Sequence, residues 1–273
     1  MSAAPLATAP DPAAYLRDYL AEAPVALAVE RSLECHVFHG RRLARPVLDL
    51  GCGDGLFAQV LFGQRDAVCV GLDADERELE NARRRGVYRT LLAARAEHIP
   101  LRPGAARTVI SNSVLEHIPP LDAVLREVHR VLARGGELLI TVPTEDYERN
   151  QAPFLALRAL GLVRAADAFR QRFNTFWKHY HAYPPARWTA LLAEAGLRVV
   201  ESRRFAPRGT TVVNGLMVPV ALPGALMKAR WGRWTLSPRA RRAVLRPVVD
   251  LLASRIGATA SDGGLVFLRA VKP

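Results

Sequence analysis

The residues best suited to bind a ligand are three glycines that follow a short apolar stretch. Residues 47–55 read Val-Leu-Asp-Leu-Gly-Cys-Gly-Asp-Gly, with glycine at positions 51, 53 and 55. Glycine adopts positive φ angles and has no Cβ, so a ligand can approach the main chain of such a turn closely. The G-x-G-x-G spacing differs from the G-x-G-x-x-G of a dinucleotide site, and no Gly-Lys-Ser/Thr follows, which excludes a P-loop.

Acidic residues near this turn are suited to bind polar groups of a ligand. Asp73 ends a second apolar stretch, Val68 to Leu72. A carboxylate at the end of a strand can accept hydrogen bonds from both hydroxyls of a ribose. Asp73 could instead cap the helix expected from residue 75. Asp49 or Asp54 could bind an ammonium group, and Asp49 could alternatively be a structural acid beneath the turn.

Side chains that could accept a proton lie after the expected fourth strand and in an aromatic segment, 173–183. Histidine titrates near neutral pH and therefore suits a general base. Alternatively, the histidine after the strand braces the next helix, and the aromatic segment packs as a lid. The candidate proton acceptors are His117, His179, Tyr180, His181 and Tyr183.

Alternating apolar stretches and amphipathic segments should position these residues. Strands are expected at 46–50, 67–72, 88–93, 107–112, 137–142, 197–205 and 264–271. Helices are expected at 24–38, 56–63, 75–85, 121–132 and 186–195. This alternation predicts an α/β fold with a doubly wound, mostly parallel sheet. A ligand should then bind at the carboxyl ends of the strands.

Four segments resemble the class I S-adenosylmethionine-dependent methyltransferases, in the order typical of that family. They are VLDLGCGDG at 47–55, VCVGLD at 68–73, ARAEHIP at 94–100 and TVISNSVLEH at 108–117. The resemblance implies a Rossmann-like, seven-stranded sheet with an antiparallel final strand. It also implies S-adenosylmethionine as cofactor, and no metal. The cofactor-binding residues that it implies are Asp49, Gly51, Cys52, Gly53, Asp73, Ala74, Ala96, Glu97 and Asn112.

Other positions refine this resemblance. Asn112, Ser113 and Glu116 should lie near the methyl group. Similar proteins often carry acids where this chain has Arg95 and Arg107. Arg95 puts in doubt a side-chain contact with the adenine amino group. Asp73 and the backbone of residues 96–98, which the resemblance places near the adenine, remain available.

Two insertions follow the fifth and sixth strands, at the end of the sheet where the ligand is expected. They cover residues 144–183 and 206–262 and should form a helical lid over the substrate. The expected organisation is a flexible N-terminal segment over 1–23 and a methyltransferase domain over 24–273. The helix at 24–38 should pack near the cofactor or cover it.

Charge is distributed unevenly along the 273 residues. Residues 1–143 carry 17 basic and 18 acidic residues, whereas 144–273 carry 21 basic and 8 acidic ones. An apolar run at 212–227, too short and too interrupted by proline to span a bilayer, precedes arginines and two tryptophans. The region 206–246 therefore suggests contact with an anionic membrane or a lipid-linked substrate. The alternative is a buried cap with solvated arginines.

The predicted function is S-adenosylmethionine-dependent methylation of a small-molecule, glycan or lipid-linked acceptor, with oxygen favoured as the acceptor atom. The alternatives are a non-catalytic, membrane-associated binding protein and an RNA methyltransferase. Nucleic acid is the less favoured partner because no recognised RNA-binding module is present. Three dispersed cysteines and a start without a secretory signal predict a cytoplasmic protein, with peripheral contact at the inner face of the membrane.

Overall fold

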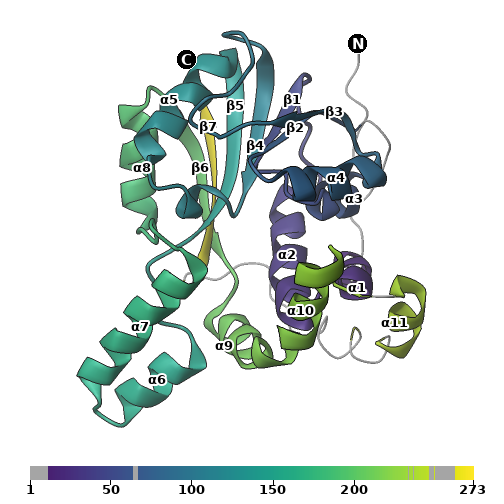
Figure 1. The fold of residues 1–273 in the computed structure, drawn as a ribbon. Helices are drawn as coiled ribbons and strands as arrows, with labels where there is room; N and C mark the ends of the chain where they lie inside the picture. The colour runs from purple at the N-terminus through teal and green to yellow at the C-terminus, as the bar shows by residue number, and fades with distance from the viewer. Residues whose placement is uncertain (1–11, 64–66, 233, 236, 246–248, 250–261) are drawn as a thin grey trace.

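The computed structural model describes all residues except 1–11, 64–66, 233, 236, 246–248 and 250–261 (Figure 1). A seven-stranded sheet with the order β3-β2-β1-β4-β5-β7-β6 forms its centre. The strands are β1 (Val47–Leu50), β2 (Val68–Asp73), β3 (Tyr88–Ala93), β4 (Ala106–Asn112), β5 (Leu132–Pro143), β6 (Arg198–Phe205) and β7 (Leu265–Val271). Only β7 runs antiparallel to its neighbours, β5 and β6. The predicted fold class is confirmed.

Helices cover both faces of this sheet (Figure 1). Helices α1 to α4 pack against one face, and α5 and α8 pack against the other. Their bounds are α1 (Pro12–Glu22), α2 (Val25–Phe38), α3 (Leu56–Phe62), α4 (Glu76–Arg85), α5 (Leu121–Val131) and α8 (Pro185–Glu194). The sequence pattern located the last five of these to within one residue at each end.

Helix α1 corrects the expectation that residues 1–23 form a flexible segment. Residues 1–11 lie outside the described residues, but Pro12–Glu22 is a helix. Tyr15, Leu16, Tyr19 and Leu20 are at most 6% exposed. Their spacing places them on one side of the helix, which packs against α2. Burial of this apolar stripe explains why the segment is ordered.

Strand β5 is longer than the sequence suggested. It begins at Leu132, where α5 ends, and not at Glu137. Leu132 pairs with Ala106, and the register then shifts before Glu137 pairs with Thr108. Gly135, at φ +69°, lies in this irregular part and occupies the left-handed region that glycine tolerates best. Gly135 and its neighbour Gly136 therefore lie inside an irregular part of β5.

Both insertions leave the sheet at the same end. Pro143 and Phe205, the last residues of β5 and β6, both pair with Leu265. The first insertion contains α6 (Ala152–Ala159) and α7 (Val163–Trp177), which project from the sheet as a helical pair (Figure 1). The second contains α9 (Arg208–Met217), α10 (Leu222–Trp231), α11 (Pro238–Val244) and the short 3-10 helix η2 (Pro219–Ala221). Among the described residues, no helix is long and apolar enough to cross a membrane.

Candidate active site

The glycine turn after β1 is held against the neighbouring strand. The amides of Gly51 and Cys52 both donate to the carbonyl of Leu72, at 2.8 and 3.0 Å. Gly51 has φ +76°, and a Cβ there would overlap the side chain of Val114. At Gly53, with φ +52°, a Cβ would meet nothing within 4 Å. Gly51 is therefore required by packing, whereas Gly53 leaves open space above the turn.

Asp73 connects this turn to the start of α4. Its carboxylate accepts hydrogen bonds from the amides of Gly53, at 2.8 Å, and Asp75, at 2.9 Å. Asp75, and not Asp73, caps α4, because the Asp75 side chain accepts from the amide of Arg77. Asp73 is half-buried, and each carboxylate oxygen has further acceptor capacity. It is thus oriented toward the open space at Gly53 and remains able to bind two hydroxyl groups.

Asp49 lies beneath the turn as a buried acid. It is 3% exposed and accepts a hydrogen bond of 2.6 Å from the hydroxyl of Tyr88. Burial raises its pKa to about 7, against the opposing effect of the Tyr88 hydrogen bond. The geometry therefore matches the structural interpretation of Asp49.

The other predicted cofactor residues surround the same end of the sheet. Cys52 is buried, and burial raises the pKa of its thiol, which disfavours a nucleophilic role. Ala74 is exposed beside Asp73, whereas Ala96 is 7% exposed in the loop after β3. Arg95 forms an ion pair of 2.5 Å with Glu97. Arg95, which departs from the family pattern, is thus paired with the nearby acid Glu97.

Asn112, at the end of β4, belongs to a buried network with helix α2. Its amide nitrogen donates to Glu34 at 2.8 Å, and its amide oxygen accepts from Thr141 at 2.7 Å. The hydroxyl of Ser113 also donates to Glu34. One guanidinium nitrogen of Arg31 donates to both oxygens of Glu34, at 2.9 and 2.7 Å. Helix α2 therefore packs against the end of β4 and fixes the orientation of Asn112.

Sequence reasoning missed Glu34, although the chain contains a signal for it. Glu34 stands between Leu33 and Cys35, in a helix whose neighbouring side chains are buried. A completely buried carboxylate requires partners, so an acid at a core position of a helix indicates a polar network. Its partner Asn112 is 78 residues away in the chain, which no local pattern reveals.

His117, after β4, and His179, in the first insertion, come together. Their ring centroids are 5.2 Å apart. The Nδ1 of His117 lies 3.2 Å from the carbonyl of Lys178, so that nitrogen carries the proton and donates. Its Nε2 then faces Glu116, 3.6 Å from Oε1. Burial lowers the pKa of both histidines, that of His179 to about 4. Burial therefore favours the neutral form of both rings at the strand end.

Tyr180 and His181 occupy different environments from these two histidines. The ring nitrogens of His181 lie 3.0 Å from the hydroxyl of Tyr183 and 2.9 Å from the carbonyl of Ile118. Both nitrogens are thus engaged within the protein. The side chain of Tyr180 is 53% exposed, while its amide donates to the carbonyl of Glu116. Of the four predicted catalytic residues, the structure brings His117 and His179 together at the strand ends.

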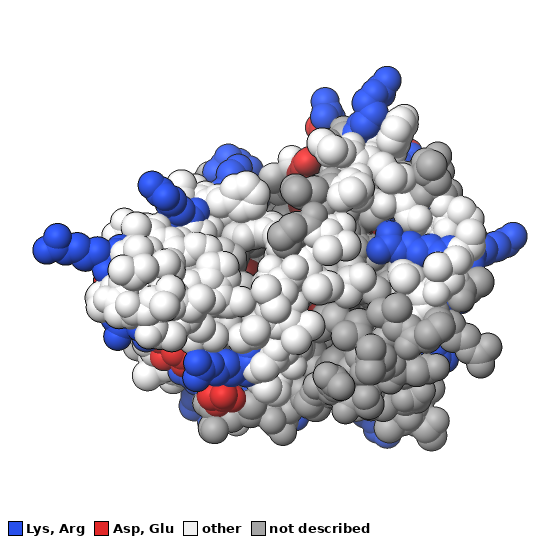
Figure 2. Space-filling model, turned by 90° about the horizontal axis from the view of Figure 1, so that it is seen from below, with Lys and Arg blue, Asp and Glu red and all other residues white. Residues whose placement is uncertain are grey.

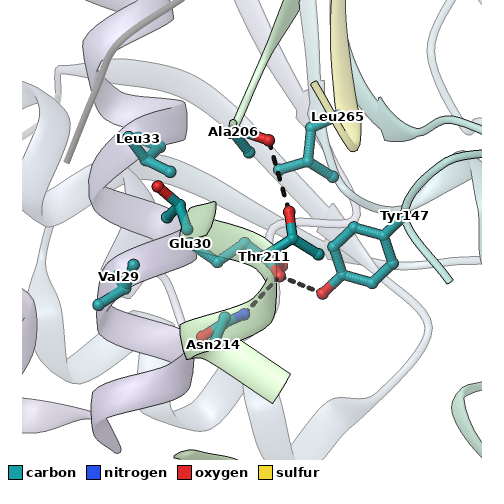
Figure 3. Close-up of a pocket in the computed structure, with 9 residues that line it drawn as sticks. Val29, Glu30, Leu33, Tyr147, Ala206, Thr211, Asn214 and Leu265 are labelled. Carbon is teal, nitrogen blue, oxygen red and sulfur yellow. Dashed lines mark hydrogen bonds between the residues drawn. The ribbon is translucent and has the colours of Figure 1, made fainter. Parts of the chain in front are cut away.

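A small pocket lies beside the α2 network, between α2, α9 and the loop after β5 (Figure 3). The hydroxyl of Tyr147 donates to Glu30 at 2.5 Å, and the amide of Asn214 donates to the same carboxylate oxygen at 3.3 Å. The ring of Tyr147 is 5.9 Å from that of His179, between centroids. Tyr147 therefore contacts both His179 and the carboxylate that binds Asn214 of the second insertion.

Comparison with known proteins agrees with this geometry. Residues 48–140 match the family described as a methyltransferase domain. A malonyl-[acyl-carrier protein] O-methyltransferase of Legionella pneumophila is 36% identical over 106 residues, covering 37% of each chain. A ubiquinone biosynthesis O-methyltransferase of Pseudomonas aeruginosa is 34% identical over 163 residues, covering 57% of this chain and 65% of the relative. The similar segment thus spans between about a third and two thirds of these relatives.

Solved structures share the fold at low sequence identity. An S-adenosylmethionine-dependent methyltransferase of Thermotoga maritima has a TM-score of 0.54 at 18% identity, covering 95% of this chain and 94% of the other. The [4+2]-cyclase SpnF has a TM-score of 0.51 at 19% identity, covering 83% and 75%. Because a cyclase shares the fold, the fold by itself does not define the reaction. The family match, the motifs and the strand order together identify a class I S-adenosylmethionine-dependent methyltransferase domain in this chain.

Proposed function

We propose that this protein transfers a methyl group from S-adenosylmethionine to a small-molecule acceptor, with oxygen as the acceptor atom favoured by the sequence. The observation that carries the proposal is the arrangement of Gly53 and Asp73: an open turn beside a carboxylate with free acceptor capacity. When bound, S-adenosylmethionine supplies a methyl group activated by a positively charged sulfur. Asp73 would hold the ribose hydroxyls, the space above Gly53 would admit the ligand, and the buried Ala96 would border the adenine.

The contribution of the chain to transfer would be alignment and removal of a proton. Glu34 fixes Asn112 at the end of β4, so this edge of the site is rigid before ligands bind. His117 presents Nε2 at the same edge and is the proposed proton acceptor, with the ring of His179 packed against it. Tyr180 and His181 would contact the acceptor from the first insertion. His181 is held there by its hydrogen bond with the hydroxyl of Tyr183.

We also propose that a lipid-linked acceptor is taken from an anionic membrane surface by a cytoplasmic protein bound at the inner face. Both insertions expose large apolar side chains, namely Leu160, Leu162, Phe176, Leu216, Val220, Leu226 and Trp231. Exposed basic side chains accompany them: Arg158, Arg164, Arg172, Lys178, Arg208 and Arg230. Figure 2 shows this face as largely uncharged, with Lys and Arg projecting around its edge. Such a surface suits an interfacial contact.

The second insertion forms ion pairs with residues near the proposed cofactor site. The ammonium of Lys228 in α10 lies 2.9 Å from the carboxylate of Glu78 and 3.6 Å from that of Asp54. Asp54 belongs to the glycine turn, and Glu78 lies in the first turn of α4. A membrane-bound second insertion would therefore lie beside the proposed cofactor site.

Calorimetric titration with S-adenosylmethionine tests the proposed function. Wild type should bind, and Asp73→Ala should weaken binding at least about tenfold, because charge-assisted hydrogen bonds contribute roughly 1.5–3 kcal/mol each. Asp122→Ala is the matched control, since the Asp122 side chain on α5 is 71% exposed and pairs only with Arg126 among the described residues. Equal binding by wild type and Asp73→Ala would refute the assignment. Binding without methylation of lipids, glycans or quinone precursors would favour a non-catalytic binding protein.

A further inference from the structure

The second insertion contains a helix whose polar side faces the protein and whose apolar side faces solvent. In α9, Thr211 is 2% exposed and Asn214 is 8% exposed, whereas Val213 and Leu216 are 42% and 55% exposed. At about 3.6 residues per turn, the two polar residues lie on the opposite side of the helix from the two apolar ones. This arrangement is the reverse of the pattern expected for a helix that packs on a protein core in water.

The outward apolar side continues beyond the end of α9. Val220, in η2, is 65% exposed, and seven residues separate it from Val213, which is about two helical turns. Val213, Leu216 and Val220 are called the outer stripe below. Helix α9 lies at the lower end of the molecule in Figure 1, the end from which Figure 2 is viewed. Apolar side chains that line up on an exposed surface indicate a binding partner.

The buried polar side of α9 is connected to the proposed proton acceptors (Figure 3). The side-chain amide of Asn214 donates to Glu30 at 3.3 Å, and the hydroxyl of Tyr147 donates to the same carboxylate oxygen at 2.5 Å. The ring of Tyr147 in turn contacts His179, with 5.9 Å between centroids. A short chain of contacts therefore leads from α9 through Glu30 and Tyr147 to the histidine pair.

Helix α9 has little intrinsic stability. Its ten residues, RGTTVVNGLM, include two glycines, two threonines and two valines, which form helices less readily than alanine or leucine. A short helix of this composition depends on packing against other groups. The inner side supplies some of that packing: at Gly215, a Cβ would lie only 2.2 Å from Oε1 of Gln151. A partner that covers the outer stripe would stabilise the helix further.

We infer that an anionic bilayer surface covers the outer stripe, and that its binding regulates the proposed active site by stabilising α9 in its docked position. Charge favours this partner. The sequence has no acidic residue between Glu201 and Asp250, and Arg208, Arg230 and Arg239 are exposed. Apolar side chains flanked by arginines match the acyl boundary and the anionic headgroups of a bilayer. The inference rests on the proposed function, because the site that it regulates is the proposed active site.

The direction of the effect follows from linkage between the two faces of α9. A bilayer that binds the docked helix more tightly than an unravelled one shifts the population towards the docked helix. The hydrogen bond from Asn214 to Glu30 is then present in a larger fraction of molecules, and so is the support for Tyr147 beside His179. Removal of the Asn214 side chain should break this connection while the outer stripe still binds the bilayer.

Hydrogen exchange measured by mass spectrometry on the full chain tests the inference. Vesicles of phosphatidylcholine and phosphatidylglycerol should slow exchange at least about threefold both in α9 and in residues 144–151, whereas vesicles of phosphatidylcholine alone should not. Leu216→Ser should abolish the slowing in both segments. Asn214→Ala should keep it in α9 and lose it in residues 144–151. Val200→Ser, at an exposed position of β6, is the matched control and should behave as wild type.

The outcomes separate this inference from the proposed function. Slowing that is confined to α9 in wild type, that survives Leu216→Ser, or that is equal with phosphatidylcholine alone overturns the inference. Slower exchange in α9 at higher protein concentration without vesicles would assign the outer stripe to a second copy of the chain, and would also overturn it. Wild type that binds S-adenosylmethionine but shows no vesicle effect contradicts this inference alone. Vesicle-dependent slowing without binding of S-adenosylmethionine counts against the methyltransferase proposal instead.

Discussion

At the scale of single residues, carboxylates near the strand ends differ in role because their partners differ. Asp73 is half-buried and bonded to backbone amides, which leaves it available to a ligand. Glu34 is buried and accepts hydrogen bonds from Arg31, Asn112 and Ser113, so it joins α2 to the end of β4. Glu116 is buried, one of its oxygens has no hydrogen-bond partner in the part of the chain that the structure describes, and burial raises its pKa to about 8. Residue type alone does not distinguish these three roles.

The raised pKa of Glu116 gives a prediction about stability. Between its ordinary pKa of 4.5 and about 8, the folded protein holds a proton that the unfolded chain has lost. The free energy of unfolding should therefore fall as pH rises through this range, since each pKa unit corresponds to about 1.4 kcal/mol. Asp49 should add a similar decrease up to about pH 7.

Glu116→Gln should remove the part of this pH dependence that Glu116 causes, so the variant should gain on wild type between pH 5.5 and 8.5. Urea unfolding at several pH values measures the difference, with Glu80→Gln as an exposed control. A constant difference between Glu116→Gln and wild type across this range would contradict the assigned pKa.

At the scale of elements, α1 and α2 complete the core on one face of the sheet. Leu16 and Tyr19 of α1 are at most 1% exposed and belong to the same cluster as Phe267 of β7. Helix α2 continues this packing and presents Glu34 to the end of β4. Loosening α1 should therefore disturb α2, and with it the network that fixes Asn112.

Leu16→Ala tests the contribution of α1. The substitution should lower the free energy of unfolding by about 2–4 kcal/mol, which is typical when a buried leucine is truncated. Leu160→Ala, at a position 73% exposed in the first insertion, is the matched control and should change stability by less than about 0.5 kcal/mol. Denaturant unfolding of both variants measures this difference. Similar stability of the two variants would contradict a contribution of α1 to the core.

At the scale of the whole molecule, the two insertions gather apolar side chains from distant parts of the chain at one end. Phe176 belongs to the first insertion and Leu226 to the second; they are 74% and 72% exposed. The net charge of +12 and the acid-free stretch between Glu201 and Asp250 favour approach to an anionic surface. The proposed membrane contact thus depends on both insertions together.

Sedimentation with vesicles tests this contact. Wild type should bind vesicles of phosphatidylcholine and phosphatidylglycerol, and added salt should weaken binding. Replacing Phe176 and Leu226 together by serine should reduce partitioning at least about tenfold, because burying each side chain contributes roughly 1.5–3 kcal/mol. Val200→Ser, at an exposed position of β6, is the control. Equal binding to vesicles of phosphatidylcholine alone would refute the electrostatic part of the proposal.

The sequence by itself determined the features that depend on neighbouring residues. Apolar periodicity and glycine positions located the seven strands and most helices, because strand and helix periods are local properties. The glycine turn and Asp73 were predictable for the same reason: each is attached to the end of one strand, and parallel strands bring those ends together. The order of the motifs then indicated the family.

Only the tertiary structure decided the contacts between residues far apart in the chain. The sequence could not pair Glu34 with Asn112, place Glu116 beside Glu30, or show that His181 is engaged by Tyr183 and Ile118. The packed helix α1 was missed because its short apolar stripe follows a stretch rich in alanine and proline. Burial, and therefore the charge and availability of each acid, arises when separate elements pack together, so it cannot be read from the order of residues alone.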